Sequence, residues 1–154
     1  EKEIAERAAA GKSLIDGLTD SKHLGSPDYQ KAITQHKSYI IALQSCGLEV
    51  HVLESCEDYP DSTFVEDVAL ITPKCAIFTR PGAESRRGEV EQIETVLRDQ
   101  FDNVERVEAP GTIEAGDIMM VDNHYYIGLS DRKEKKPIGF FYFFNGVSVI
   151  FVPQ

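Results

Sequence analysis

The spacing of apolar residues predicts helices and strands that alternate along the chain. Ser26, Pro27 and Asp28 are typical of a helix start, apolar side chains follow at helical spacing, and Gly47 is expected to end that helix. A second amphipathic helix is predicted over 86–101, and the Ala- and Glu-rich stretch 1–11 predicts a short helix. Strands are predicted at 48–53, 64–71, 75–79, 104–108, 117–121 and 124–128, the last two turning at Asp122-Asn123.

The order of these elements repeats the unit ββαβ. A faint internal similarity accompanies it, because Asp67, Leu70 and Ile77 find like residues 50 positions later. A unit of about 50 residues that contains a hairpin is typical of blades or arrays built by repetition. The pattern therefore predicts an α/β fold made of repeated ββαβ units.

Residues 138–152 do not continue this pattern. They form an uncharged, aromatic run with Asn145-Gly146 in its middle, which is a strong signal for a hydrophobic C-terminal hairpin. The run is shorter than the roughly 20 residues that span a bilayer. We expect a buried or self-associating hairpin rather than a membrane anchor.

Charge and cysteine content narrow the function classes. The 154 residues include 26 acids and 16 bases, a net charge of −10, which disfavours a nucleic-acid partner but suits a cationic ligand. The three cysteines form no CxxC pair, so neither a structural metal site nor a disulfide framework is expected. Residues 1–10 do not read as a signal peptide, and reduced thiols suit a cytoplasmic location.

Acidic residues stand out at three places in the sequence. Asp61 follows a proline in a loop, Glu66-Asp67 lies inside a predicted strand, and Glu114 precedes another. Neighbouring strand residues face opposite sides of a sheet, so Glu66 and Asp67 are not expected to enter one pocket. Two interpretations stay open: buried acids that hold a backbone turn or an arginine, and a carboxylate cluster that awaits a cation.

Arginines gather at predicted strand ends and loops. Arginine can grip a carboxylate with two parallel hydrogen bonds, although solvated arginines on an acidic surface explain the same positions. Acids and arginines together would suit a zwitterion such as a free arginine derivative. The loop 13–25 carries apolar residues, which either pack on the core or form a lid over a ligand. The arginines are Arg80, Arg86, Arg87 and Arg132.

The sequence carries five motifs, at 13–19, 60–67, 80–88, 108–117 and 126–132. Together they resemble the dimethylarginine dimethylaminohydrolase family of the amidinotransferase superfamily. The resemblance implies a five-bladed α/β-propeller of the pentein type, of which this chain would form about two and a half blades. It also implies hydrolysis of methylated arginine to citrulline and a methylamine without a metal or other cofactor. A cysteine thiolate would attack the guanidinium carbon, and a histidine would protonate the leaving amine. The motifs are SLIDGLT at 13–19, PDSTFVED at 60–67, RPGAESRRG at 80–88, EAPGTIEAGD at 108–117 and YIGLSDR at 126–132.

The resemblance also implies roles for individual residues. Leu18 falls in the family's lid loop, and Glu114 matches the acid that orients the catalytic histidine. Arg86 and Arg132 match the arginines that hold the substrate's carboxylate. The acids that match contacts to the substrate's cationic end or to backbone groups are Asp61, Glu66 and Asp67.

Both ends of the chain depart from the family pattern. Residues 1–12 read as a helix where the family has a core strand, and residues 133–154 match nothing in it. The family's catalytic cysteine and histidine lie beyond the matched part and have no counterpart here. We therefore expect a single, truncated domain over 1–154 that binds a guanidino substrate but is inactive alone.

Two other functions stay open. One is a non-catalytic module for binding an arginine derivative or for assembly. The other is arginine or agmatine deiminase chemistry on the same fold. An opened ring would expose blade edges, and the hydrophobic tail would then either cover one edge or drive homo-oligomerisation.

Overall fold

A computed structural model describes residues 4–73, 75–122, 124–129 and 148–153 of this protein. The chain divides into two compact units, Glu1–Val65 and Glu66–Gln154. No helix in the described ranges is both long and apolar enough to cross a bilayer.

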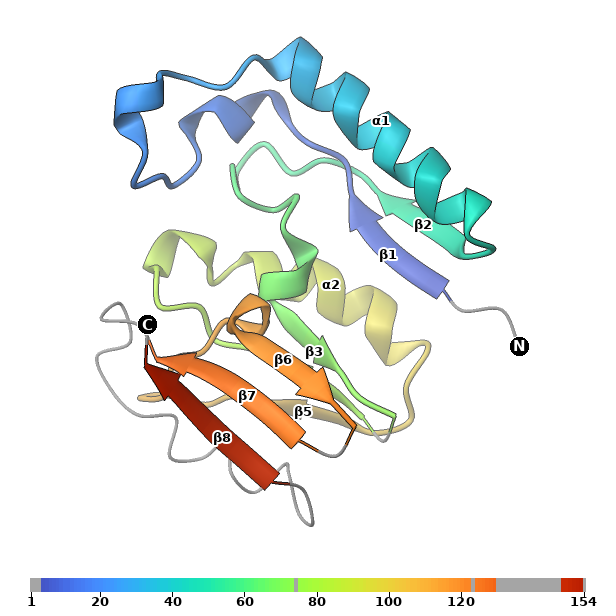
Figure 1. The fold of residues 1–154 in the computed structure, drawn as a ribbon, viewed down its shortest axis with the longest axis vertical. Coiled ribbons are helices and arrows are strands. Elements are labelled where there is room, and N and C mark those ends of the chain that lie inside the picture. Colours follow the sequence, from blue (N-terminus) through green and yellow to red (C-terminus); the bar gives the residue numbers. More distant parts are fainter. Residues whose placement is uncertain (1–3, 74, 123, 130–147, 154) are drawn as a thin grey trace. The chain divides into compact units, whose positions relative to one another are not determined.

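The first unit is built on two parallel strands. Strands β1 (Ile4–Ala8) and β2 (Glu49–Leu53) pair from Ile4 opposite Glu49 to Ala8 opposite Leu53. Helix α1 (Tyr29–Ser45) connects them and lies alongside the pair in Figure 1. Two short 3-10 helices, η1 (Lys12–Asp16) and η2 (Lys22–Leu24), occupy the loop before α1.

The expected helix over 1–11 is wrong, because this stretch contains β1. Ala and Glu favour helices locally, but backbone pairing with β2 outweighs that weak preference. The small side chains of Ala8 and Ala10, at the end of β1 and just after it, are buried. The chain therefore does have a strand ahead of the loop 13–25, as the family pattern requires.

Helix α1 begins two residues later than expected and ends as expected. The side chain of Asp28, not Ser26, caps it by accepting the N–H of Lys31 at 3.0 Å. Gly47 adopts φ 91° directly after the helix. The N–H of Gly47 donates to the carbonyl of Gln44, and that of Leu48 to Leu43, which is a Schellman motif.

The second unit contains two sheets with the same strand order. In the first, β3 (Ala69–Ile71) is antiparallel to β4 (Ala76–Phe78), which is parallel to β5 (Val104–Arg106). In the second, β6 (Ile118–Val121) is antiparallel to β7 (His124–Leu129), which is parallel to β8 (Ser148–Pro153). Figure 1 shows β8, in red, beside β7. Helix α2 (Glu89–Arg98) joins β4 to β5.

Strand β8 takes the place in its sheet that β5 takes in the other. Residues 148–153 are thus a strand, as expected, and they pair in parallel with β7. The remainder of the expected hairpin, 138–147, lies outside the described residues. Strand β8 therefore continues the repeat instead of departing from it.

Short 3-10 helices precede both sheets. Helices η3 (Val65–Asp67) and η5 (Ala115–Asp117) each end in an aspartate just before a strand, and η4 (Glu84–Arg86) precedes α2. The expected strand over 64–71 therefore starts late, and the expected helix over 86–101 starts at Glu89. Because Glu66 and Asp67 lie in η3, the strand argument that separated them does not apply.

The core of the second unit lies between its sheets. Helix α2 buries Val90, Ile93 and Leu97, as its spacing predicts. Phe78 and Ile77 on β4 have no exposed surface. One apolar cluster joins residues of both sheets, namely Cys75, Ile77, Val107, Ile113, Tyr125 and Ile127, with Leu70 and Ile118 packed against it.

Candidate functional site

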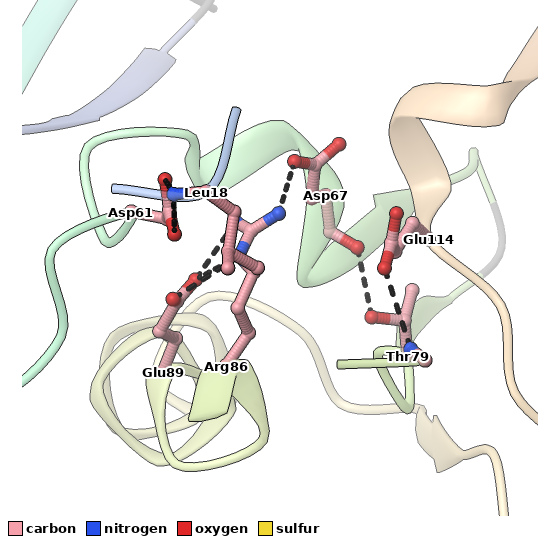
Figure 2. Close-up of polar contacts among 8 residues, drawn as sticks. Leu18, Asp61, Asp67, Thr79, Arg86, Glu89 and Glu114 are labelled. Atoms are coloured by element: carbon pink, nitrogen blue, oxygen red, sulfur yellow. Dashed lines mark hydrogen bonds and ion pairs between the residues drawn. The ribbon is translucent and has the colours of Figure 1, made fainter. Parts of the chain in front are cut away.

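In the first unit, Asp61 holds the loop that carries Leu18. The buried Asp61 carboxylate accepts the Leu18 N–H with both oxygens, at 3.1 and 3.0 Å, as Figure 2 shows. The backbone comes so close that a Cβ on Gly17 would lie 2.6 Å from Asp61 Oδ1, so glycine is needed there. The Leu18 side chain is 58% exposed. These two predicted site residues are therefore brought together.

A second carboxylate, that of Glu57, holds the start of the same loop. Its Oε1 accepts the N–H of Lys12, and its Oε2 the N–H of Ser13, each at 2.9 Å. These two backbone hydrogen bonds lower the pKa of Glu57 below its ordinary value. Glu57 was not predicted from the sequence, since nothing local links an acid in one loop to amides 45 and 44 residues away.

A cavity of about 640 Å³ lies under this loop. Residues 14–27 supply most of its wall, and Asp61 and Phe64 supply the rest. Apolar walls with a few fixed polar groups are typical of small-molecule sites. The size and lining suit a ligand with an apolar stem and a charged end.

In the second unit, Arg86 is enclosed by two carboxylates. Its Nη1 donates to Asp67 at 2.7 Å, its Nη2 to Glu89 at 2.8 Å, and its Nε to both Glu89 oxygens at 3.1 Å (Figure 2). Burial acts to lower the pKa of Arg86, but the hydrogen bonds to Glu89 and Asp67 outweigh it and raise that pKa. Removing either acid would leave a buried charge poorly compensated.

Asp67 is fixed from several directions. Its carbonyl accepts the Thr79 hydroxyl at 2.8 Å, while its side chain pairs with Arg86. It also lies against Gly116, where an added Cβ would overlap Asp67 Oδ1. Asp67 and Arg86, predicted independently as site residues, thus form one cluster. Glu89, which is 2% exposed, completes it and was missed, although its i+3 spacing from Arg86 is a signal for such a pair.

Glu114 lies at the start of η5. Its Oε1 accepts the Gly82 N–H at 3.3 Å, which connects η5 to the turn after β4. Glu66 is exposed in η3, and Arg132 lies outside the described residues. Within the described part of the chain, no group of three or more His, Cys, Asp or Glu side chains is placed to hold a metal ion.

Comparisons of sequence place this chain beside dimethylargininases. The model of the family "N,N dimethylarginine dimethylhydrolase, eukaryotic" matches residues 20–152. N(G),N(G)-dimethylarginine dimethylaminohydrolase from Pseudomonas aeruginosa is 61% identical over 132 residues, which are 85% of this chain and 51% of the relative. The protein of the same name from Streptomyces coelicolor is 34% identical over 119 residues, 77% of this chain and 46% of the relative. The chain thus spans about half the length of these curated relatives.

Solved structures of dimethylargininases are also similar to this chain. A dimethylarginine dimethylaminohydrolase captured as an adduct with S-methyl-L-thiocitrulline superposes with a TM-score of 0.94 at 47% identity, over 100% of this chain and 62% of that one. A mutant Pseudomonas aeruginosa enzyme complexed with citrulline gives a TM-score of 0.93 at 47% identity, over 99% and 61% of the two chains. These relatives share the α/β fold of the pentein, or amidinotransferase, superfamily. The chain belongs to the dimethylarginine dimethylaminohydrolase family.

Proposed function

We propose that this chain binds a methylated arginine as the substrate-binding part of a dimethylarginine dimethylaminohydrolase, whose reaction yields citrulline and a methylamine. The observation that carries the proposal is the fit of 99% of the chain, at a TM-score of 0.93, to a relative complexed with citrulline. The finer architecture proposed with it is a single domain over 1–154 with about two and a half of five propeller blades.

The guanidinium and the carboxylate of the ligand match two kinds of side chain. Asp61, Glu66 and Asp67 take the cationic end of the ligand or hold the backbone around it, because carboxylates pair well with a guanidinium. Arg86 and Arg132 take the carboxylate. Leu18 covers the ligand from the loop above the cavity, and Glu114 orients the histidine of the family mechanism.

Preorganisation supports the proposed role of Arg86. Its guanidinium is already held by Asp67 and Glu89, so little side-chain entropy is lost when a ligand arrives. The two acids give the cluster a formal charge of −1, which favours a ligand that brings its own cation close by. A zwitterionic arginine derivative meets that requirement better than a simple anion.

We propose further that the chain alone does not turn the ligand over. In the mechanism that the family resemblance implies, an activated cysteine thiol attacks the guanidinium carbon. In the described residues no cysteine has a hydrogen bond with a histidine, and the buried Cys75 thiol lies 3.6 Å from the Thr72 hydroxyl. All three cysteines are free, which supports the cytoplasmic location that we propose with this function.

Calorimetric titration with two ligands tests the proposal. We expect one site for asymmetric dimethylarginine and at least about tenfold weaker binding of agmatine, which lacks the carboxylate. Asp67→Asn should weaken binding, whereas Glu105→Gln, which removes an exposed acid on β5, should not.

A parallel assay for citrulline and ammonia separates the functions. No product from dimethylarginine is expected from this chain by itself. Ammonia released from arginine or agmatine would overturn the proposal in favour of deiminase chemistry. Absence of dimethylarginine binding at millimolar concentration would overturn it outright.

A further inference from the structure

The loop 11–27 is attached to the loop 56–62 by carboxylates rather than by apolar packing. Glu57 accepts the N–H groups of Lys12 and Ser13, and Asp61 accepts that of Leu18. Three neighbouring side chains, those of Ile15, Leu18 and Leu24, are 44%, 58% and 77% exposed. Hydrogen bonds to charged acceptors therefore carry much of this attachment.

Glu57 fits the first turn of η1 closely. Each carboxylate oxygen receives its own backbone donor, and both donors belong to the end of a helix that has no partner for them within the helix. A Cβ on the buried Gly11 would lie only 3.1 Å from Glu57 Oε1, so this glycine makes room for the carboxylate. Neither the residue before η1 nor any side chain within it provides this cap.

The two attachments enclose a short segment that forms part of the cavity wall. Glu57 fixes residues 12 and 13, and Asp61 fixes residue 18. The residues between them, Leu14 to Gly17, line the cavity together with Leu18. Because both ends of this segment are pinned, its position, and hence the shape of the cavity, depends on the two acids.

We propose that Glu57 is a positioning residue: its carboxylate fixes the first turn of the loop 11–27 and thereby sets the shape of the cavity that receives the ligand. Glu57 is not among the residues that line the cavity and acts through the backbone of Lys12 and Ser13. The inference rests on the proposed function only for the identity of the ligand, dimethylarginine.

Amide hydrogen exchange in the unliganded chain tests the attachment. Glu57→Gln leaves one acceptor and puts an N–H donor against a backbone donor, so the amides of Lys12 and Ser13 should exchange at least about tenfold faster. The amide of Leu18, held by Asp61, should change less. Asp58→Asn is the matched control, since it removes the same charge from the next exposed acidic position. Unchanged exchange at Lys12 and Ser13 in Glu57→Gln would overturn the proposal.

Dimethylarginine affinity tests the consequence for the cavity. Glu57→Gln should lower the affinity at least about threefold with an unchanged midpoint of urea unfolding, and Asp58→Asn should leave both unchanged. Faster exchange with unchanged affinity would overturn the positioning role. If the wild-type chain does not bind dimethylarginine, the proposed function fails, while the exchange result still decides whether Glu57 fixes the loop.

Discussion

Three glycines lie where a carboxylate occupies the space that a Cβ would need. Glu57 lies against Gly11, Asp61 against Gly17 and Asp67 against Gly116. None of these glycines has a positive φ, so what each one contributes is its missing side chain. The carboxylates that hold the loop amides and Arg86 therefore pack directly against glycine backbone. This close packing keeps each carboxylate near its hydrogen-bond donors.

A double-mutant cycle tests the close contact between Asp67 and Gly116. In Gly116→Ala the new methyl group would overlap Asp67 Oδ1 and push the carboxylate from Arg86. We expect a loss of about 1–3 kcal/mol in the free energy of unfolding, measured by urea denaturation. In an Asp67→Ala background the same change should cost much less. Equal costs in the two backgrounds would show that the overlap is not the cause.

His36 on α1 should make stability depend on pH. Partial burial lowers the pKa of His36 below its ordinary 6.5, and the positive charge of Arg7 lowers it further. The unfolded chain therefore binds this proton more readily, so the contribution of His36 is complete above pH 6.5 and is lost as the pH falls through the lowered value.

The free energy of unfolding, measured by urea denaturation at a series of pH values, tests this expectation. We expect the free energy of unfolding to fall between about pH 7 and pH 5, and His36→Gln to flatten that part of the profile. His23→Gln, at an exposed position in η2, serves as control and should keep the wild-type slope. An identical slope in His36→Gln would contradict the assignment.

Among the secondary-structure elements, helix α1 has two candidate N-cap residues, Ser26 and Asp28. The sequence favours Ser26, but the structure places the cap at Asp28. Asp28→Ala should lower the free energy of unfolding by about 1 kcal/mol, because the Lys31 N–H loses its acceptor. Ser26→Ala should have almost no effect in the same urea titration. The reverse order of the two costs would place the cap at Ser26.

Elements defined by local signals could be predicted from the sequence. The buried face of α2, the turn after α1 at Gly47 and the positive φ of Asp122 between β6 and β7 all follow from neighbouring residues. Strand β1 could not be predicted from local signals, since its conformation depends on pairing with β2 some 45 residues away. Local propensity alone favours a helix there.

The candidate site was predictable to a similar extent. Asp61 stood out because it follows a proline in a loop, and Asp67 because it lies in an otherwise apolar segment. Each holds a backbone group or an arginine, one of the two interpretations left open. Their companions Glu57 and Glu89 lie in ordinary acidic segments. Only the fold reveals that one meets the amides of η1 and the other encloses Arg86.

At the scale of the whole chain, repetition is the main feature. The sheets β3-β4-β5 and β6-β7-β8 share order and direction, and η3 and η5 precede them in equivalent places. Strand β6 is the last in its sheet and leaves Met119, Met120 and Val121 about half exposed. An exposed apolar strand at a sheet edge favours association with another chain.

Sedimentation velocity tests this expectation. We predict that the sedimentation coefficient rises with protein concentration, and that Met119→Lys combined with Met120→Lys reduces the rise, because charged side chains protect strand edges. A coefficient that is independent of concentration for the wild-type chain would contradict self-association.

Amide NMR spectra recorded during a titration with dimethylarginine would show whether this chain binds methylated arginine at the acidic and arginine side chains named above. We expect saturable shifts at Leu18, Asp67, Arg86 and Glu114, with Glu105 on β5 unaffected. Shifts confined to residues away from this set, or no shifts at millimolar ligand, would contradict the claim.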